Sequence, residues 1–310
     1  MIAASLGLIT AATVFGKSDT AKLESAGSSH WSYAPHMLNR RSYTASAEIG
    51  DKIYVAAGMV GNSGRPLNLF EQFDPAENEW SSLPLVPEKF SAAAGVALGS
   101  SMYVIGGNGD PKNKAVDGRQ VFAYDSVRKR WSRKASLPKV RTNLAAVDLG
   151  GEIYALGGLD PVHATNSVFI YNPAKNRWRV GPHLPEELHA LTAVRFHGEI
   201  WVIGGQDAAG KATNRVWIYN AKSRKWRSGP PMPRRMETAG AAVLDDKIHV
   251  VLETKYLIWD ARSRRWTIGP GLETPRHALA VFAVENTLYA IGGCVIPQLE
   301  DSAVVERIGL

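Results

Sequence analysis

A phrase of 40 to 51 residues recurs along the chain, and each copy carries a tryptophan at the same place. The six tryptophans in register are Trp31, Trp80, Trp131, Trp178, Trp226 and Trp266. A pair of small residues, mostly Gly-Gly, occurs in five of the units: Ala57-Gly58, Gly106-Gly107, Gly157-Gly158, Gly204-Gly205 and Gly292-Gly293. A repeat of this length indicates an architecture in which each unit buries a face against its neighbours.

Each unit contains four short runs that read as strands. In the third unit these are LAAVDLG, EIYALGG, SVFIYN and RWRVGP. The 29 glycines and the charged fraction of 21% also favour short strands and many turns over long helices. Four strands per repeat predict a propeller blade, and the tryptophans are expected to fill the space between blades.

The repeat resembles the kelch repeat. The resemblance rests on the Gly-Gly pair, on the turns Phe73-Asp74-Pro75 and Tyr171-Asn172-Pro173, and on the tryptophan that follows them. It covers residues 31 to about 308 and implies an all-β, six-bladed kelch-type β-propeller. It says little about function, because one fold hosts many activities.

Two units depart from the pattern. The sixth unit ends without a tryptophan strand, whereas SSHWSYAP at the N-terminal side has no unit of its own. We therefore expect the N-terminal segment to supply the fourth strand of the last blade and to close the ring. The fifth unit, KIHVVLETKYLIWD, has no Gly-Gly pair, and Glu253-Thr254-Lys255 is expected to form a tight hairpin turn. That short turn predicts a notch in the loop face of the ring.

Cations precede the first strand of five units, on the face that carries the loops between second and third strands. Arg41, Arg141 and Arg276 are in register, each thirteen residues before an aromatic residue. Together with loop residues they predict a binding site for a carboxylate, sulfate or phosphate. The predicted site residues are Arg41, Arg141, Arg276, Arg40, Arg235, Lys89, His189, Asn108, Asp160 and Asp207. The alternative interpretation is that each arginine belongs to the repeat and satisfies backbone carbonyl groups.

The turns between third and fourth strands are basic in units two to five. They read VRKRW, AKNRW, AKSRKW and ARSRRW, against AENEW in unit one. Such turns are either a solvated face or a contact for an anionic membrane surface or polymer. The net charge of +7 and the pI of about 9.4 suit anionic partners. A nucleic-acid partner is not expected, since no aromatic platform is interleaved with these charges.

Motifs of common catalytic sites are missing from the sequence. There is no GxxxxGK[ST], no HExxH and no GxSxG. Galactose-oxidase-like enzymes of the same superfamily need a Cys crosslinked to a Tyr, a second Tyr and two His for copper. Only the position of the single Cys294, after the last Gly-Gly pair, fits that pattern. We therefore expect no metal and no cofactor.

The sequence predicts a binding protein for an anionic small molecule, a glycan or an acidic protein, acting as a monomer. The alternative is a carbohydrate epimerase or mutarotase of the sialic-acid epimerase type, which also occurs among exported six-bladed kelch proteins. Ring opening needs a proton donor and an acceptor. Candidates for these roles are Asp160, His163, Asp207 and His189.

The N-terminal residues predict export. Residues 1–16 are uncharged and apolar, like the central region of a secretory signal, but are too short to span a bilayer. The string IAASLGLITAA resembles the segment after the paired arginines of twin-arginine signals, which implies a start upstream of Met1 and a bacterial periplasmic location. Residues 17–30 read as a polar linker and residues 31–310 as the propeller. The alternative is a cytoplasmic protein with a short N-terminal helix.

Overall fold

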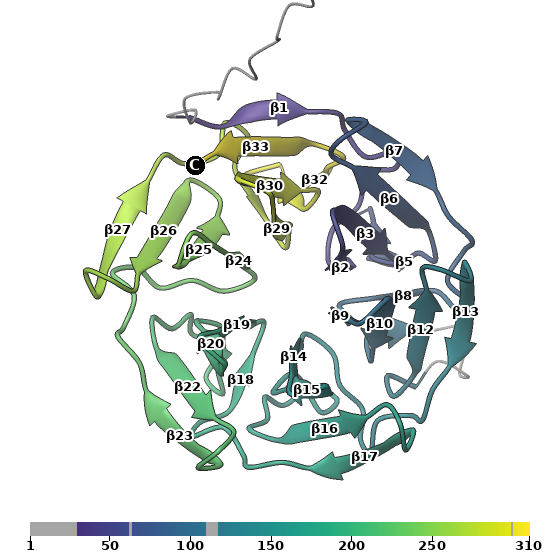
Figure 1. Cartoon of the computed structure of the whole chain (residues 1–310), viewed down its shortest axis with the longest axis vertical. Coiled ribbons are helices and arrows are strands. Elements are labelled where there is room, and N and C mark those ends of the chain that lie inside the picture. The colour runs from purple at the N-terminus through teal and green to yellow at the C-terminus, as the bar shows by residue number, and fades with distance from the viewer. Residues whose placement is uncertain (1–29, 62–63, 110–116, 299) are drawn as a thin grey trace, which may run out of the picture.

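The computed structural model describes residues 30–61, 64–109, 117–298 and 300–310. In these residues the regular structure is entirely strand and turn, as the composition predicts. Six four-stranded antiparallel sheets surround a central opening (Figure 1). The predicted export segment, residues 1–16, lies outside the described residues, as does the predicted linker apart from His30. Export and a monomeric state therefore stay predictions.

The first five sheets run outward from the axis in chain order, and in the sixth the outer strand is β1. The sheets are β2 (Ala45–Ile49), β3 (Lys52–Ala56), β6 (Phe70–Asp74) and β7 (Glu79–Ser82); β9 (Ala94–Leu98), β10 (Ser101–Ile105), β12 (Val121–Asp125) and β13 (Arg130–Arg133); β14 (Ala145–Leu149), β15 (Glu152–Leu156), β16 (Val168–Asn172) and β17 (Arg177–Val180); β19 (Thr192–Phe196), β20 (Glu199–Ile203), β22 (Val216–Asn220) and β23 (Lys225–Ser228); β24 (Gly240–Leu244), β25 (Lys247–Leu252), β26 (Lys255–Asp260) and β27 (Arg265–Gly269); and β29 (Ala280–Val284), β30 (Thr287–Ile291), β33 (Val305–Gly309) and β1 (Ser32–Ala34). We number the sheets one to six in this order.

The sixth sheet joins the two ends of the described chain. Strand β1 pairs antiparallel with β33, with Ser32 opposite Arg307 and Ala34 opposite Val305. The expectation that the N-terminal segment supplies the outer strand of the last sheet agrees with this pairing.

The tryptophans of the repeat link neighbouring sheets. Each indole Nε1 donates a hydrogen bond to a backbone carbonyl that follows the outer strand of the preceding sheet, at 2.8 to 3.1 Å. Trp80 of the first sheet bonds Pro35, and Trp31 of the sixth sheet bonds Pro270 of the fifth. The six bonds therefore run once around the molecule, and the indole rings pack between sheets as the sequence predicts.

A second cycle of hydrogen bonds surrounds the axis. Just before the inner strand of each sheet, one non-glycine residue has a φ of 50° to 53°. The six residues are Tyr43, Ala92, Asn143, Ala190, Thr238 and Ala278. The N–H of each donates to the carbonyl of the one before, and Tyr43 donates to Ala278, at 2.8 to 3.2 Å. This inner cycle fixes the spacing of the sheets at the mouth of the central opening.

The mouth face also carries short antiparallel ladders of two-residue strands. They are formed by β4 (Met59–Val60) with β5 (Arg65–Pro66), β8 (Phe90–Ser91) with β11 (Asn108–Gly109), β18 (Leu188–His189) with β21 (Gln206–Asp207), and β28 (Arg276–His277) with β31 (Cys294–Val295) and β32 (Glu300–Asp301). The fifth sheet has no such ladder among the described residues. Its β25 and β26 are joined by Glu253 and Thr254 alone, so the predicted tight hairpin is confirmed.

Candidate functional site

The three arginines in register lie inside the sheets rather than at the mouth. Arg41, Arg141 and Arg276 are exposed by only 0%, 2% and 0%. In the other sheets the same repeat position is filled by Phe90, Leu188 and Met236, each 1% exposed. The position is therefore a core position. The prediction that these guanidinium groups line a ligand site is corrected, because they are buried away from solvent.

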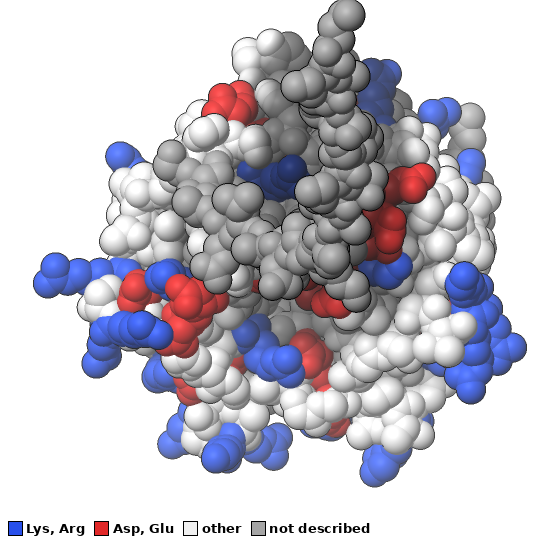
Figure 2. Space-filling model, turned by 45° about the horizontal axis from the view of Figure 1, so that its top comes forward, with Lys and Arg blue, Asp and Glu red and all other residues white. Residues whose placement is uncertain are grey.

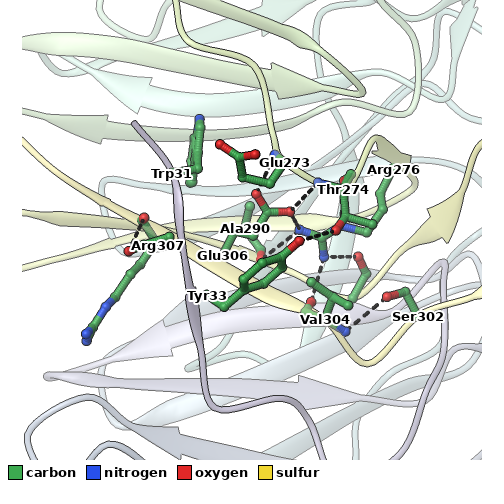
Figure 3. A network of polar contacts seen from close by, with 12 residues as sticks. Trp31, Tyr33, Glu273, Thr274, Arg276, Ala290, Ser302, Val304, Glu306 and Arg307 are labelled. Atoms are coloured by element: carbon green, nitrogen blue, oxygen red, sulfur yellow. Dashed lines mark hydrogen bonds and ion pairs between the residues drawn. The ribbon is translucent and has the colours of Figure 1, made fainter. Parts of the chain in front are cut away.

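Arg276 illustrates what these side chains do (Figure 3). Its guanidinium donates to the carbonyls of Thr274 at 3.1 Å, Gly292 at 2.7 Å and Val304 at 2.6 Å, and to Glu306 Oε1 at 2.9 Å. The carboxylate of Glu306 also accepts the N–H groups of Glu273 and Thr274, at 2.7 and 3.1 Å. The arginine thus satisfies carbonyl groups at the end of the sheet, which is the alternative that the sequence left open.

Arg41 and Arg141 are bound in the same manner. Arg41 donates to Glu71 at 2.8 Å and to the carbonyl of Val55 at 3.1 Å. Arg141 pairs with Asp160 at 3.0 Å and stacks over the ring of Phe169 at 5.0 Å. The carboxylate of Asp160, a predicted site residue, is therefore paired with the buried Arg141.

The remaining predicted residues are spread over the mouth face. Arg40, Lys89, Arg235 and Asn108 are exposed, and His189 is half-buried. Asp207 accepts the backbone N–H groups of Ala209 and Lys211 at 3.0 Å, which lowers the pKa of its carboxyl and holds its loop. The structure therefore does not gather the predicted cations around one point.

A cavity of about 490 Å³ opens at the mouth, above the inner hydrogen-bond cycle. Its polar lining residues are Tyr43, Ser91, Asn108, Asn143, His189, Gln206, Glu237, Thr238, Glu253 and His277. Two of the predicted residues, His189 and Asn108, meet here. Among the described residues that line this cavity there is no lysine and no arginine.

The short ladders place the lining side chains. Successive residues of a strand point to opposite sides, so a buried residue is followed by one that faces the cavity. Leu188 is buried and His189 lines the cavity, opposite Gln206 across the ladder. Arg276 and His277 repeat this arrangement, with His277 opposite Cys294.

The cavity brings imidazole groups close to carboxylates. Burial lowers the pKa of His189, and the charges of Glu237 and Asp207 oppose that effect. Burial likewise lowers the pKa of His277, against Glu253, Glu237 and Asp301. Burial raises the pKa of Tyr43, with Cys294, Glu237 and Asp301 adding to it. Burial therefore favours the neutral form of both imidazoles.

His277 has a further unusual property. Its Nδ1 is buried and has no hydrogen-bond partner among the described residues. Its ring meets that of Tyr43 edge-on, with centroids 6.2 Å apart. A buried polar atom without a partner is uncommon in folded proteins.

Sequence reasoning missed Tyr43 and Glu237. A signal for Glu237 was present: it stands 48 residues after His189 and 40 before His277, the same intervals that separate Trp178, Trp226 and Trp266. Glu237, His189 and His277 therefore stand one position after the core position that Met236, Leu188 and Arg276 fill. Shifting the aligned position by one residue would have found Glu237, whereas Tyr43 stands two positions after Arg41.

Below the inner cycle lies a central channel of about 440 Å³ lined by the inner strands. Its walls are mostly Ala, Val and Leu, with Glu48, Asp148 and Arg195 among the polar exceptions. Burial, aided by Asp51, raises the pKa of Glu48 to about 7. Arg195 and Asp148 form an ion pair at 2.8 Å.

The described residues include one cysteine, Cys294, and several carboxylate and imidazole groups outside the mouth cavity. No group of three or more His, Cys, Asp or Glu is arranged to hold a metal ion in that part of the chain. Burial raises the pKa of the Cys294 thiol, so it is less reactive than an exposed thiol. Within the same residues no helix has the length and hydropathy to cross a bilayer.

Known proteins resemble this chain in parts. Kelch-like protein 25 of Xenopus tropicalis is 30% identical over 135 residues, which are 41% of this chain and 22% of that protein. Alpha-scruin of Limulus polyphemus is 28% identical over 131 residues, which are 41% of this chain and 14% of that protein. The matches thus cover less than a quarter of these relatives.

One solved structure and one family model cover more. The structure titled "Structure of YjhT" superposes with a TM-score of 0.75 at 15% identity, over 87% of this chain and 95% of that one. At this identity the match shows only that the two folds are similar. The model of the KLHDC2/KLHL20/DRC7 Kelch-repeats domain matches residues 43–251. The chain therefore belongs to the kelch-repeat domain family.

Proposed function

We propose that the chain is a closed six-bladed kelch propeller that binds a hydroxyl-rich ligand, a sugar or a glycan, in the mouth cavity. The observation that carries the proposal is the lining: amides, hydroxyls, imidazoles and two carboxylates converge, and no cation stands among the described lining residues. Such groups pair with sugar hydroxyls, which both donate and accept hydrogen bonds. The pairing of β1 with β33 and the two hydrogen-bond cycles support the closed ring.

The same lining argues against a small anion as the ligand. Glu237 and Glu253 would repel a carboxylate or sulfate in the cavity, and the arginines in register are buried. The exposed Arg40, Lys89 and Arg235 remain at the mouth face, where they can contact an acidic group carried by a larger glycan or protein. The proposed ligand is therefore neutral at the part that enters the cavity.

The test is a melting screen with neutral sugars and oligosaccharides, sialic acid, uronates, sulfate and phosphate. A ligand at one hundred times its dissociation constant adds roughly 2.7 kcal/mol to stability, which is visible as a melting shift. We expect shifts with neutral sugars, and we expect Glu237→Gln to weaken them while Arg235→Gln leaves them unchanged. Shifts confined to the anions, and strengthened by Glu237→Gln, would contradict the proposal.

A second candidate function is sugar mutarotation or epimerisation. It is favoured by one observation, the grouping of two neutral imidazoles with a carboxylate around one cavity. Opening a sugar ring needs one group that donates a proton and one that accepts it. One-dimensional NMR of an anomer mixture checks this: faster exchange with the parent protein and slower exchange with Glu237→Gln supports catalysis. Exchange at the uncatalysed rate leaves binding as the function.

A further inference from the structure

The face opposite the mouth carries a series of exposed basic turns. They join the third and fourth strands of sheets two to five, at residues 128–130, 175–177, 222–225 and 262–265, and we call them the basic crescent. Every lysine and arginine in these segments is exposed. Lys and Arg side chains stand out around the rim of the molecule in Figure 2.

Most cations of the basic crescent have no ion-pair partner. Among the described residues, Arg128 alone in the crescent forms an ion pair, with Asp125 at 2.8 Å. A few residues further along the same outer strands, Arg179 and Arg227 pair with Glu152 and Glu199 at 2.5 and 2.6 Å. Carboxylates of the second strands therefore neutralise Arg179 and Arg227, whereas most cations of the basic crescent remain available to a partner.

The backbone of these turns does not require basic residues. One residue in each turn has a positive φ: Asn78 at 54°, Lys129 at 53°, Asn176 at 44°, Arg224 at 55° and Arg264 at 54°. Asparagine tolerates this conformation well, whereas lysine and arginine are disfavoured in it. Sheets one and three show that asparagine serves the turn. A basic residue at the other three positions is conformationally less suitable and adds charge.

The distribution of charge on this face favours a linear polymer over a flat membrane as the binding partner. Turns between first and second strands lie on the same face, nearer the axis, and carry acidic residues such as Asp51, Asp245 and Glu285, all exposed. An anionic bilayer pressed against this face would meet those carboxylates together with the crescent. A linear molecule that follows the outer turns avoids them.

Single-stranded nucleic acid fits the crescent less well. Such binding uses aromatic rings on which bases stack. In sheets two to five the tryptophans of the outer strands are half-buried, and their indole N–H groups are bound to neighbouring carbonyls, as Trp131 is to Pro84 at 2.8 Å. We propose that the basic crescent binds a linear acidic polysaccharide, through its sulfate, phosphate or carboxylate groups, along the outer edge of the ring. This site is independent of the mouth cavity.

The experiment measures binding of the full chain to fluorescent heparin at 50 and 200 mM NaCl, with neutral dextran as the negative probe. We expect binding that weakens on the order of a hundredfold between the two salt concentrations, as several cations release counterions. The variant Lys129→Asn/Arg224→Asn/Arg264→Asn should bind at least tenfold more weakly, with a salt slope reduced by about three. Its melting temperature should be unchanged or higher, because asparagine suits the positive φ.

A matched control separates the crescent from net charge. The variant Arg65→Asn/Lys211→Asn/Arg234→Asn removes three exposed cations from loops of the mouth face, and it should bind heparin like the parent. Glu79→Arg extends the crescent into the first sheet and should strengthen binding severalfold. Equal loss in the two triple variants overturns the proposal, and so does tighter binding to single-stranded RNA or to phosphatidylglycerol vesicles than to heparin.

Discussion

At the residue scale, the buried arginines show how one repeat position accepts two solutions. Arg41, Arg141 and Arg276 fill it in three sheets, and apolar side chains fill it in the rest. An arginine there needs a carboxylate and several carbonyls around it, as Glu306 and Gly292 provide for Arg276. The position therefore contributes to stability, and its register alone carries no information about a ligand.

Removing one partner of the Arg276–Glu306 pair should be strongly destabilising. Arg276→Met leaves the carboxylate of Glu306 buried without its cation, and it also removes the arginine donor from the carbonyl of Gly292. We expect a loss of about 3 to 5 kcal/mol in the free energy of unfolding, measured in urea. Arg276→Met/Glu306→Met should recover part of this loss. A single variant as stable as the parent would return Arg276 to the list of candidate ligand residues.

His249 should make stability depend on pH. It is 1% exposed, and its Nδ1 is 2.7 Å from the hydroxyl of Tyr256. Burial lowers the pKa of its imidazole from 6.5 to about 4, so the unfolded chain binds a proton that the folded chain does not. This contribution is fully present above pH 6.5 and is lost as pH falls toward 4, by up to ~3 kcal/mol.

Melting temperatures of the parent and of His249→Phe between pH 7.5 and 4.5 check this effect. The parent should lose more stability over that interval than the variant, because phenylalanine does not titrate. Parallel curves for the two proteins would mean that the His249 imidazole is not held neutral.

The limits of sequence reasoning are also visible at this scale. The packing of Trp31 and its counterparts between sheets was predicted correctly, because a large aromatic side chain that recurs at a fixed interval needs a large buried volume, and the space between sheets provides it. Arg276 and His277 could not be separated, since the sequence does not tell which of two adjacent residues faces the core. The sequence therefore selected Arg276 in place of its neighbour His277, and Glu237 was missed.

At the element scale, the end of each second strand is a point of close approach. Gly158 has a φ of 94°, and a Cβ there would lie 2.7 Å from the carbonyl oxygen of Thr142. Gly150, in the turn at the other end of the strand, also has a positive φ, of 61°, but a Cβ there would meet nothing within 4 Å. The two glycines therefore both have a positive φ, but only Gly150 has room for a Cβ atom.

This contrast predicts different costs for the same substitution. Gly150→Ala should destabilise by about 1 kcal/mol, because only the backbone conformation is strained. Gly158→Ala adds a backbone clash and should cost at least ~3 kcal/mol. Chemical denaturation of the two variants gives the comparison, and equal losses would show that the strand end has room to relax.

The fifth sheet shows how an element can shape a binding face by what it leaves out. Its hairpin of Glu253 and Thr254 replaces the loop and ladder that the neighbouring sheets build above the mouth. The short hairpin was predictable, because the missing Gly-Gly pair and the short turn can both be read in the sequence. The polar side chains that share the mouth cavity with Glu253 were not predictable, because they come from different sheets and meet only through the arrangement of the sheets around the axis.

At the scale of the whole molecule, two cycles of hydrogen bonds connect sheets that otherwise repeat one another. The inner cycle passes through backbone groups and the outer one through indole rings. Each sheet therefore has two neighbours, and the sixth is bonded to the first as the others are to one another. Linear repeat arrays differ, because their terminal units have one neighbour and loosen first.

The ring should consequently unfold as one unit. Denaturation followed by tryptophan fluorescence and by far-ultraviolet circular dichroism should give coincident transitions. The signals report on different parts, since six of the nine tryptophans lie on or beside the outer strands, whereas strands fill the whole molecule. A fluorescence transition that precedes the other would indicate that the outer strands separate first and that the cycles do not couple the sheets.

The pairing of β1 with β33 also determines how the molecule responds to mechanical force. The strands are antiparallel, so both described chain ends, His30 and Leu310, leave the sixth sheet on the same side. Tension between these ends loads the residue pairs one after another, starting with Ser32 and Arg307, and does not shear all of them at once. We therefore expect β1 to separate from β33 at a lower force than strands that are loaded in shear.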